Sequence, residues 1–150
     1  MMHKPGVVSM DPNFEYHLSY GRGKLALALP AESHVEVLLP NEVAAAPDPL
    51  AAVVSALDHP LGERRLADFA GARSVAIAIN DKTRPIPHDI LLPPLLQRLE
   101  ALGVPPEAIT LVIAAGTHAP TSPEAFEQVV PPEVLARYAV ISHDCDAPDL

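Results

Sequence analysis

The chain of 150 residues contains little cysteine, little positive charge and no long apolar run, and each of these shortages excludes a class of protein. Its one cysteine, Cys145, cannot form a disulfide within the chain and fits a reducing, cytoplasmic compartment. The net charge of -9 argues against nucleic acid or an anionic membrane as a partner, because both require a basic surface. No stretch reaches the roughly eighteen apolar residues that a membrane-spanning helix needs.

The two ends of the chain carry few structural signals. Residues 1–10 have neither an apolar segment nor a small-residue cleavage site, so we do not expect a secretory signal there. We expect residues 1–13 to be a disordered leader and residues 14–150 to form an α/β domain, since 49% of the residues are hydrophobic and supply a core. The last predicted strand is not followed by a capping helix. We therefore expect the chain to be truncated.

Three apolar runs predict the strands of one sheet. They are residues 74–79, 108–115 and 138–141, and polar residues follow each of them. In the first run branched side chains alternate with alanine, which is typical of a parallel strand covered on both faces. Residues 91–102 have the apolar spacing of a crossover helix, and right-handed crossovers bring the ends of successive parallel strands to one edge. This pattern predicts a Rossmann-like, open, mainly parallel sheet flanked by helices, with a ligand site beyond the carboxyl ends of its strands.

The segment before this sheet predicts a hairpin and a helix. Residues 24–29 and 34–39 are short apolar or alternating runs separated by a four-residue loop, which is typical of a β-hairpin. Asp48 and Pro49 form a helix start, with the aspartate as N-cap and the proline in the first turn. We expect this helix to end before Pro60.

Prolines also affect two later helices. Asp89 is a candidate N-cap, but Pro93 and Pro94 follow so closely that we expect regular helix only after them. Gly103 is expected to stop this helix in the left-handed conformation. Residues 122–130 begin with a serine and a proline and predict a further helix.

Polar chemistry concentrates in the loop after the first predicted strand. Here Asp81, Lys82, Thr83 and Arg84 bring a carboxylate, a hydroxyl and two cations to the edge of the sheet. The guanidinium of Arg84 is suited to a carboxylate or phosphate, and Lys82 adds a second positive charge. Such a cluster within an acidic chain indicates an anion site. The alternative is that Asp81 pairs with Arg84 and the loop is only a proline-locked turn.

A histidine follows the second predicted strand. His118 can exchange a proton near neutral pH, so it is a candidate acid–base group if it faces the same edge as Arg84. The alternative is a surface or structural histidine, which is the commoner case. Residues 143–146 combine histidine, cysteine and aspartate after the third strand, but their spacing matches no standard metal site, and we predict no metal there.

Four motifs together resemble the N-terminal domain of the lactate racemase family. They are residues 18–24, 81–87, 116–118 and 142–144, and the resemblance extends from about Phe14 to the end of the chain. It implies an isomerase that inverts a 2-hydroxy acid. In that family a nickel-pincer nucleotide, which is a pyridinium-derived mononucleotide that carries nickel, takes a hydride from the hydroxyl-bearing carbon and returns it.

The resemblance also implies roles for individual residues. Asp81, Lys82, Thr83 and Arg84 would contact the cofactor nucleotide, and Arg84 would also lie near the substrate carboxylate. His118 would be one of two histidines that move the hydroxyl proton. The second histidine, the lysine that tethers the cofactor and the nickel-binding histidine would lie in a C-terminal domain. We therefore expect this chain to need that domain as its partner and to be inactive alone.

The sequence leaves both the substrate and the function open. The sequence departs from the family pattern at Ala119, where relatives commonly carry arginine, so the substrate can be a 2-hydroxy acid or a sugar. Two other functions fit the same residues: a stand-alone nucleotide- or phosphate-binding α/β module without catalysis, and an interaction domain. The interaction domain would have an empty and poorly charged crevice.

Overall fold

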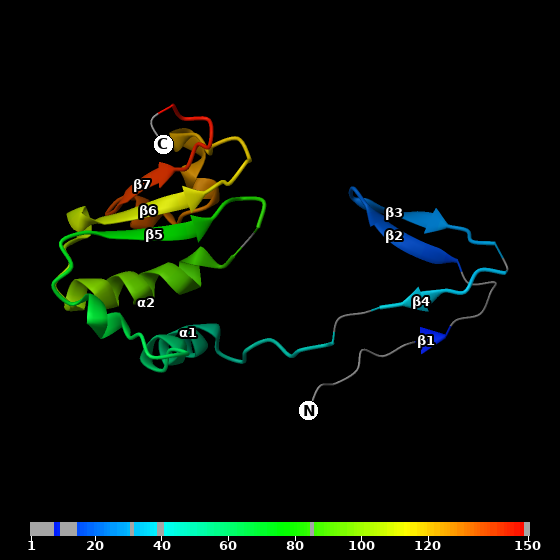
Figure 1. The fold of residues 1–150 in the computed structure, drawn as a ribbon, viewed down its shortest axis with the longest axis horizontal. Helices are drawn as coiled ribbons and strands as arrows, with labels where there is room; N and C mark the ends of the chain where they lie inside the picture. The colour runs from blue at the N-terminus through cyan, green and yellow to red at the C-terminus, as the bar shows by residue number, and fades with distance from the viewer. Residues whose placement is uncertain (1–7, 10–14, 31, 39–40, 85, 149–150) are drawn as a thin grey trace. The chain divides into compact units, whose positions relative to one another are not determined.

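The computed structural model divides the chain into two compact units, Met1–Ala45 and Ala46–Leu150. Figure 1 shows strands in the first unit and a sheet with helices in the second. No helix in the described part of the chain is long and apolar enough to cross a membrane. The described residues are 8–9, 15–30, 32–38, 41–84 and 86–148.

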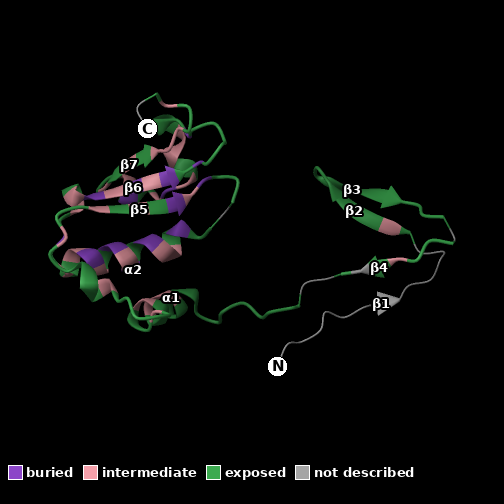
Figure 2. Ribbon diagram, viewed as in Figure 1, coloured by how far each residue is buried: buried purple, intermediate pink, exposed green. Residues whose placement is uncertain are grey.

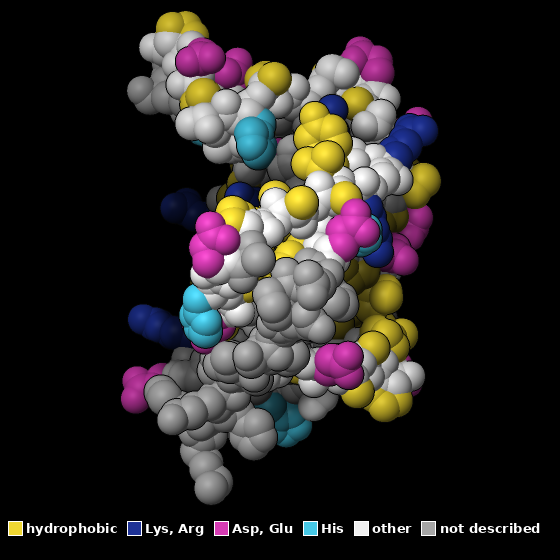
Figure 3. All heavy atoms as spheres, turned by 90° about the vertical axis from the view of Figure 1, so that its right-hand side faces the viewer, with side chains coloured by type: hydrophobic (Ala, Val, Ile, Leu, Met, Phe, Trp, Pro, Cys, Tyr) yellow, Lys and Arg dark blue, Asp and Glu magenta, His cyan; other side chains and the backbone are white. Residues whose placement is uncertain are grey.

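The first unit contains an antiparallel hairpin. β2 (Tyr16–Tyr20) pairs with β3 (Gly23–Leu27), and Leu18 lies opposite Leu25. These two leucines are 52% and 53% exposed. The surface drawn in Figure 3 shows hydrophobic side chains beside acidic ones. The hairpin thus buries little apolar area, so its pairing depends chiefly on the backbone ladder and the turn.

The strand pairing of this unit differs from the predicted one. A hairpin of residues 24–29 with residues 34–39 is wrong, because the first of these runs pairs with the residues before it. The turn that decides this contains Gly21 at a φ of 57°, and such a short turn matches the twist of the two strands better than a longer loop does. β4 (Glu36–Val37) pairs instead with β1 (Val8–Ser9).

The short strand β1 lies within the leader that we expected to be disordered, residues 1–13. At Val8–Ser9 the structure therefore has a strand where the sequence predicted none. The other residues of the leader, and Phe14 as the start of ordered structure, lie outside the described residues.

A parallel sheet of three strands organises the second unit (Figure 1). It consists of β5 (Val75–Asn80), β6 (Ile109–Ala114) and β7 (Ala139–Ser142), in the spatial order β5-β6-β7. Asn80 lies beside Ala114 in the register, so β5 and β6 end together. The three predicted strands are confirmed, as is the fold class of an α/β protein with a parallel sheet and an N-terminal hairpin.

Helices connect the parallel strands. α2 (His88–Ala101) joins β5 to β6, and a 3-10 helix (η3, Pro123–Gln128) followed by α3 (Pro132–Leu135) joins β6 to β7. The helix predicted over residues 122–130 is therefore a 3-10 helix that ends at Gln128. The prolines that follow it limit its length, because a proline cannot donate a helical hydrogen bond and disfavours helical backbone in the residue before it.

The core of the second unit lies on one face of the sheet (Figure 2). Ile109, Leu111 and Ile113 of β6 are fully buried, and they belong to the same core cluster as Leu96 and Leu99 of α2. This spacing of two along β6 is that of a strand with one buried face. The crossover helix predicted from the apolar spacing is thus confirmed as the main cover of that face.

The opposite face of the sheet carries small side chains. Ala76, Ala78 and Ala114 are exposed, and Ile141 of β7 is 52% exposed. Successive side chains of a strand point to opposite faces, so the branched residues of β5 face the core and its alanines face away. Among the described residues, the prediction that the first strand is covered on both faces is wrong.

The helix predicted to start at Asp48 is confirmed. α1 (Pro49–Asp58) begins with a proline, and the Asp48 carboxylate accepts a hydrogen bond of 2.9 Å from the Ala51 amide. The helix ends before Pro60, as expected. A local signal was sufficient here because the cap and the proline act within one turn.

The start of α2 differs from the predicted one. The helix begins at His88 and contains Pro93 and Pro94, and Asp89 lies in its first turn instead of capping it. His88 and Leu92 are buried, at 8% and 3% exposure. Their packing keeps the first turn helical although the two prolines donate no hydrogen bonds to it.

The end of α2 is as predicted. Gly103 has a φ of 89°, its amide donates to the Glu100 carbonyl at 2.9 Å, and the Val104 amide donates to the Leu99 carbonyl at 3.1 Å. This pair of hydrogen bonds is the Schellman motif, which needs a left-handed residue. Val104 is fully buried, so the stop turns the chain back into the core before β6 begins.

Candidate active site

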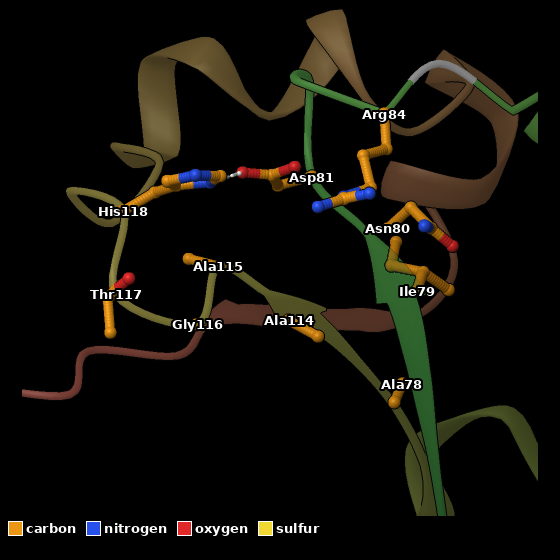
Figure 4. A pocket seen from close by; sticks show the side chains of 10 residues that line it. All are labelled: Ala78, Ile79, Asn80, Asp81, Arg84, Ala114, Ala115, Gly116, Thr117 and His118. Carbon is orange, nitrogen blue, oxygen red and sulfur yellow. Dashed lines mark hydrogen bonds and ion pairs between the residues drawn. The ribbon is translucent and has the colours of Figure 1, made fainter.

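A cavity of about 430 Å³ lies at the carboxyl ends of β5 and β6 (Figure 4). Asp81 and Arg84 line it from the loop after β5, and His118 lines it from the loop after β6. The parallel register brings these loops together although they are far apart in the sequence. The crevice predicted for these three residues is therefore present. The other lining residues are Ala78, Ile79, Asn80, Ala114, Ala115, Gly116 and Thr117.

Small residues leave the space for this cavity. Ala78 and Ala114 contribute only methyl groups from the exposed face of the sheet, so the ends of the two strands stay open. Gly116 has a φ of 61°, and the His118 amide donates to the Ala115 carbonyl at 3.0 Å across this turn. A glycine is favoured at this φ because a Cβ would be strained there. This turn fixes the backbone from which the His118 imidazole projects.

Asp81 and His118 are in direct contact. The Oδ2 atom of Asp81 lies 2.7 Å from Nδ1 of His118, and Figure 4 shows the imidazole and the carboxylate pointing toward each other. Asp81 is buried, at 8% exposure, whereas half of the His118 side chain is exposed, at 52%. The carboxylate thus forms the fixed end of this pair, and the imidazole forms its accessible end.

Thr83 holds the other oxygen of the carboxylate. Its hydroxyl donates to Oδ1 of Asp81 at 2.7 Å, and its amide donates to the same atom at 3.2 Å. The Thr83 hydroxyl is also 3.5 Å from Nδ1 of His118, at the outer limit of a hydrogen bond. Both oxygens of Asp81 are therefore engaged by groups of the chain itself.

These contacts keep Asp81 ionised. The Thr83 hydroxyl, and next to it the His118 imidazole, hold the pKa of the Asp81 carboxyl below its usual value, while desolvation acts in the opposite direction. Hydrogen bonds to the charged form favour that form. Asp81 is therefore an acceptor at neutral pH.

Arg84 does not pair with Asp81. The two residues share one backbone hydrogen bond of 3.2 Å, from the Arg84 amide to the Asp81 carbonyl. Within the described part of the chain, no carboxylate lies at ion-pair distance from the Arg84 guanidinium. The alternative of a turn closed by an Asp81–Arg84 ion pair is therefore wrong. The guanidinium at the cavity is free to bind an anion.

Lys82 stands apart from this group. It belongs to the same loop but is exposed and does not line the cavity. The structure thus divides the predicted cluster: Arg84 contributes a cation to the cavity, Thr83 supports Asp81, and Lys82 adds positive charge outside the lining.

The polar residues at and after the end of β7 do not line this cavity. The Thr121 amide donates to the Ser142 hydroxyl at 3.0 Å, and the His143 amide donates to the Ile113 carbonyl at 2.9 Å. These contacts tie the end of β7 to its neighbours. The convergence of polar strand ends thus includes two loops, and not the third that the sequence also predicted.

Three possible metal ligands gather beyond β7. The side chains of Asp144, Cys145 and Asp146 place their ligand atoms within 4.8 Å of one another. Two of them are exposed, and the Asp144 carboxylate already accepts a hydrogen bond of 3.0 Å from the Asp146 amide. This arrangement is that of a loop stabilised by its own aspartate.

Sequence reasoning missed the connection between Asp81 and His118. Both had been selected as candidates, but Asp81 had been considered only as a ligand for the cofactor or as a partner of Arg84. The available signal was positional: each follows a strand of one parallel pair, and such loops share an edge. The small cavity residues Ala78 and Ala114 had no signal beyond their place in apolar runs.

Comparisons with known proteins agree with the resemblance found in the sequence. Residues 20–150 match the family described as the lactate racemase N-terminal domain. The lactate racemase of Lactiplantibacillus plantarum is 30% identical over 92 residues, which are 61% of this chain and 22% of that protein. The lactate racemase of Thermoanaerobacterium thermosaccharolyticum is 28% identical over 131 residues, which are 85% of this chain and 30% of that protein.

A solved structure is similar as well. The lactate racemase apoprotein from Thermoanaerobacterium thermosaccharolyticum superposes with a TM-score of 0.64 at 28% sequence identity, over 87% of this chain and 30% of that one. The chain therefore spans less than a third of the length of each of these relatives.

Proposed function

The chain belongs to the family of lactate racemase N-terminal domains, and we propose that it supplies the acid–base and anion-binding part of an isomerase that inverts a 2-hydroxy acid. The observation that carries this proposal is the pair of Asp81 and His118, 2.7 Å apart, in one cavity with an Arg84 that has no carboxylate partner among the described residues. A cation is needed to bind the carboxylate of a 2-hydroxy acid, and a base is needed to remove the proton of its hydroxyl. The cavity offers both.

Arg84 binds the carboxylate of the substrate in this proposal. Its planar guanidinium can donate two parallel hydrogen bonds to a carboxylate, which fixes the orientation of the substrate as well as its position. The cavity of about 430 Å³ is of the size of small-molecule sites. Arg84 and His118 line the same cavity, so a 2-hydroxy acid held by its carboxylate at Arg84 would present its hydroxyl to His118 in this proposal.

His118 takes and returns the proton of that hydroxyl. The oxygen–hydrogen bond breaks as a bond forms between the proton and the imidazole. The carbon–oxygen bond gains carbonyl character as the hydroxyl-bearing carbon loses its hydride. In the return direction the imidazolium gives the proton back to the oxygen. An imidazole can act as a base in one direction of the reaction and as an acid in the other.

The family implies a nickel-pincer nucleotide as the hydride acceptor, and the lining residues fit its anionic part. Arg84 at the cavity and Lys82 beside it would meet the negative charges of the nucleotide. The chemistry that this cofactor supplies when bound is the acceptance and return of a hydride at the hydroxyl-bearing carbon. Among the described residues, the lining includes one imidazole and no lysine, and we follow the family resemblance in assigning the nickel-binding histidine and the lysine tether to a C-terminal domain of the whole protein.

A second function remains compatible with the same cavity. A phosphate-binding module without catalysis needs Arg84 but has no need for His118, and the free guanidinium is the observation that favours it. The interaction-domain alternative predicted a poorly charged crevice, whereas Asp81 and Arg84 both line this one.

Steady-state kinetics of a racemase that contains this domain would test the proposed function. His118→Gln keeps the size of the side chain but cannot exchange a proton near neutral pH, so we expect kcat to fall by about 10² to 10⁴. His143→Gln is the matched control, because His143 follows the neighbouring strand and does not line the cavity. A His118→Gln variant with the parent kcat and full cofactor content would exclude His118 as the acid–base group.

A further inference from the structure

We infer that Asp81 is a positioning residue, held by Thr83, that fixes His118 in the tautomer whose Nε2 lone pair is available to the cavity. The inference rests on the proposed function for its role in catalysis, but the tautomer itself is a property of this chain. It replaces the role in nucleotide binding that the family resemblance suggested for Asp81 and Thr83.

Both carboxylate oxygens of Asp81 already have hydrogen-bond partners within the chain. Oδ1 accepts from the hydroxyl and the amide of Thr83 at 2.7 Å and 3.2 Å, and Oδ2 lies 2.7 Å from Nδ1 of His118. The carboxylate is buried, so it is also shielded from solvent. Three contacts from two loops therefore hold it in one orientation.

The direction of the hydrogen bond follows from the charge of Asp81. Thr83 and His118 lower the pKa of the carboxyl, so it is ionised at neutral pH and can only accept. The imidazole must then donate through Nδ1–H. A neutral imidazole carries one proton, so Nε2 is left with its lone pair.

This arrangement matches what the proton transfer requires. The base must present a lone pair toward the substrate hydroxyl, and an Nδ1 that already carries a proton leaves Nε2 as the one basic atom. When Nε2 takes the proton, the positive charge of the imidazolium is next to the Asp81 carboxylate, which stabilises it. The pairing of an orienting carboxylate with a histidine base is a general way to fix a tautomer.

Thr83 acts on His118 indirectly, through Asp81. Its hydroxyl donates to the carboxylate oxygen that does not contact the imidazole, so it prevents Asp81 from rotating away. Serine retains this hydroxyl, whereas valine has the shape of threonine without it. This pair of substitutions separates the hydrogen bond from the packing of the side chain.

NMR spectra of the imidazole nitrogens in the purified chain would test the inference without substrate or cofactor. The chain has seven histidines, so the signals of His118 are identified by their loss in His118→Gln. We expect the parent chain to show a protonated Nδ1 and an unprotonated Nε2 at a pH where the ring is neutral. A neutral His118 that is mainly protonated on Nε2 would overturn the inference.

Variants of the two supporting residues make the test sharper. We expect Asp81→Asn and Thr83→Val to raise the fraction of the Nε2-protonated tautomer, and Thr83→Ser to keep the parent spectrum. Asp146→Asn is the control for loss of one negative charge, since Asp146 is exposed and does not line the cavity. If Asp81→Asn does not fold, the two Thr83 variants decide the question, and equal tautomer fractions in both would overturn the inference.

The tautomer measurement and the test of the proposed function can fail independently of each other. A racemase assay that shows no activity would remove the function and leave the tautomer measurement intact. In an active racemase, we expect Asp81→Asn to lower kcat and change its pH profile while KM for the 2-hydroxy acid stays close to the parent value. An increase in KM or loss of cofactor with an unchanged pH profile would instead assign Asp81 to ligand binding.

Discussion

Arg84 and Asp81 are joined by a backbone hydrogen bond of 3.2 Å, yet their side chains serve different purposes. The Asp81 carboxylate contacts His118 and Thr83, and the Arg84 guanidinium has no carboxylate partner in the described part of the chain. One loop thus supplies an orienting anion and a free cation. This division leads to distinct expectations for substitutions at each position.

The first prediction concerns Arg84 in a racemase that contains this domain. Arg84→Lys keeps the charge but loses the two-point hydrogen bonding, and a hydrogen bond to a charged group contributes about 1.5 to 3 kcal/mol. The substrate carboxylate is already charged in the ground state, so we expect the loss in KM or in cofactor retention. The measurement is steady-state kinetics with the cofactor content of each variant quantified. Arg64→Lys, at an exposed residue outside the cavity, is the control, and a fall in kcat alone would contradict the assignment.

The second prediction concerns the purified chain of 150 residues. We expect it to fold and to show no racemisation of lactate, even with mature cofactor, because the tether and nickel ligand are assigned to a C-terminal domain. It should still bind inorganic phosphate or lactate weakly at Arg84, seen as NMR shifts of residues that line the cavity. Turnover by this chain would refute the assignment. Phosphate binding that persists unchanged in an Arg84→Ala variant would place the anion elsewhere.

The third prediction is a dependence of stability on acidic pH. The pKa of Asp81 is lowered by Thr83 and His118, so its contribution to the free energy of unfolding is present above the ordinary pKa of about 3.9 and is lost as pH falls through the lowered value. Urea unfolding at a series of acidic pH values should show a shallower loss of stability for Asp81→Asn than for the parent chain. Parallel curves for the two proteins would mean that the contact between Asp81 and Thr83 does not stabilise the fold.

The fourth prediction concerns alkaline pH and a site away from the cavity. Burial, and then a hydrogen bond from its hydroxyl to Glu100, raises the pKa of Tyr138 to about 12 from an ordinary 10.0. The native state therefore holds the proton more tightly, so the free energy of unfolding should fall as pH rises from 10.0 toward about 12. A pKa difference of one unit between the folded and unfolded states corresponds to about 1.36 kcal/mol in the free energy of unfolding. Because the Tyr138 ring is partly exposed, we expect a loss of stability smaller than the full pKa difference would give.

Spectrophotometric titration of tyrosine would check this value. The chain has three tyrosines, and Tyr138→Phe should remove the step near pH 12. Tyr20→Phe, at a residue that is 74% exposed, should leave that step in place. A late step that survives in Tyr138→Phe would show that another group titrates there.

Local sequence signals determined several elements of this protein. The Asp48 cap with Pro49 places the start of α1, Gly103 places the end of α2, and the apolar runs place the three parallel strands. Each of these signals acts within a few residues, through one cap, one left-handed residue or one alternating run. For the same reason the sequence alone selected Arg84 and His118 as candidates, since each lies in the loop that follows a predicted strand.

The tertiary structure decided which of these elements and residues meet. Packing of Leu92 against the core kept helix through Pro93 and Pro94, and strand pairing joined β3 to β2 where the sequence predicted a later partner. The sequence suggested Arg84, which is near Asp81 along the chain, as the side-chain partner of Asp81. The parallel register of β5 and β6 placed His118 at 2.7 Å instead, because partner choice depends on distances across the sheet that no local pattern encodes.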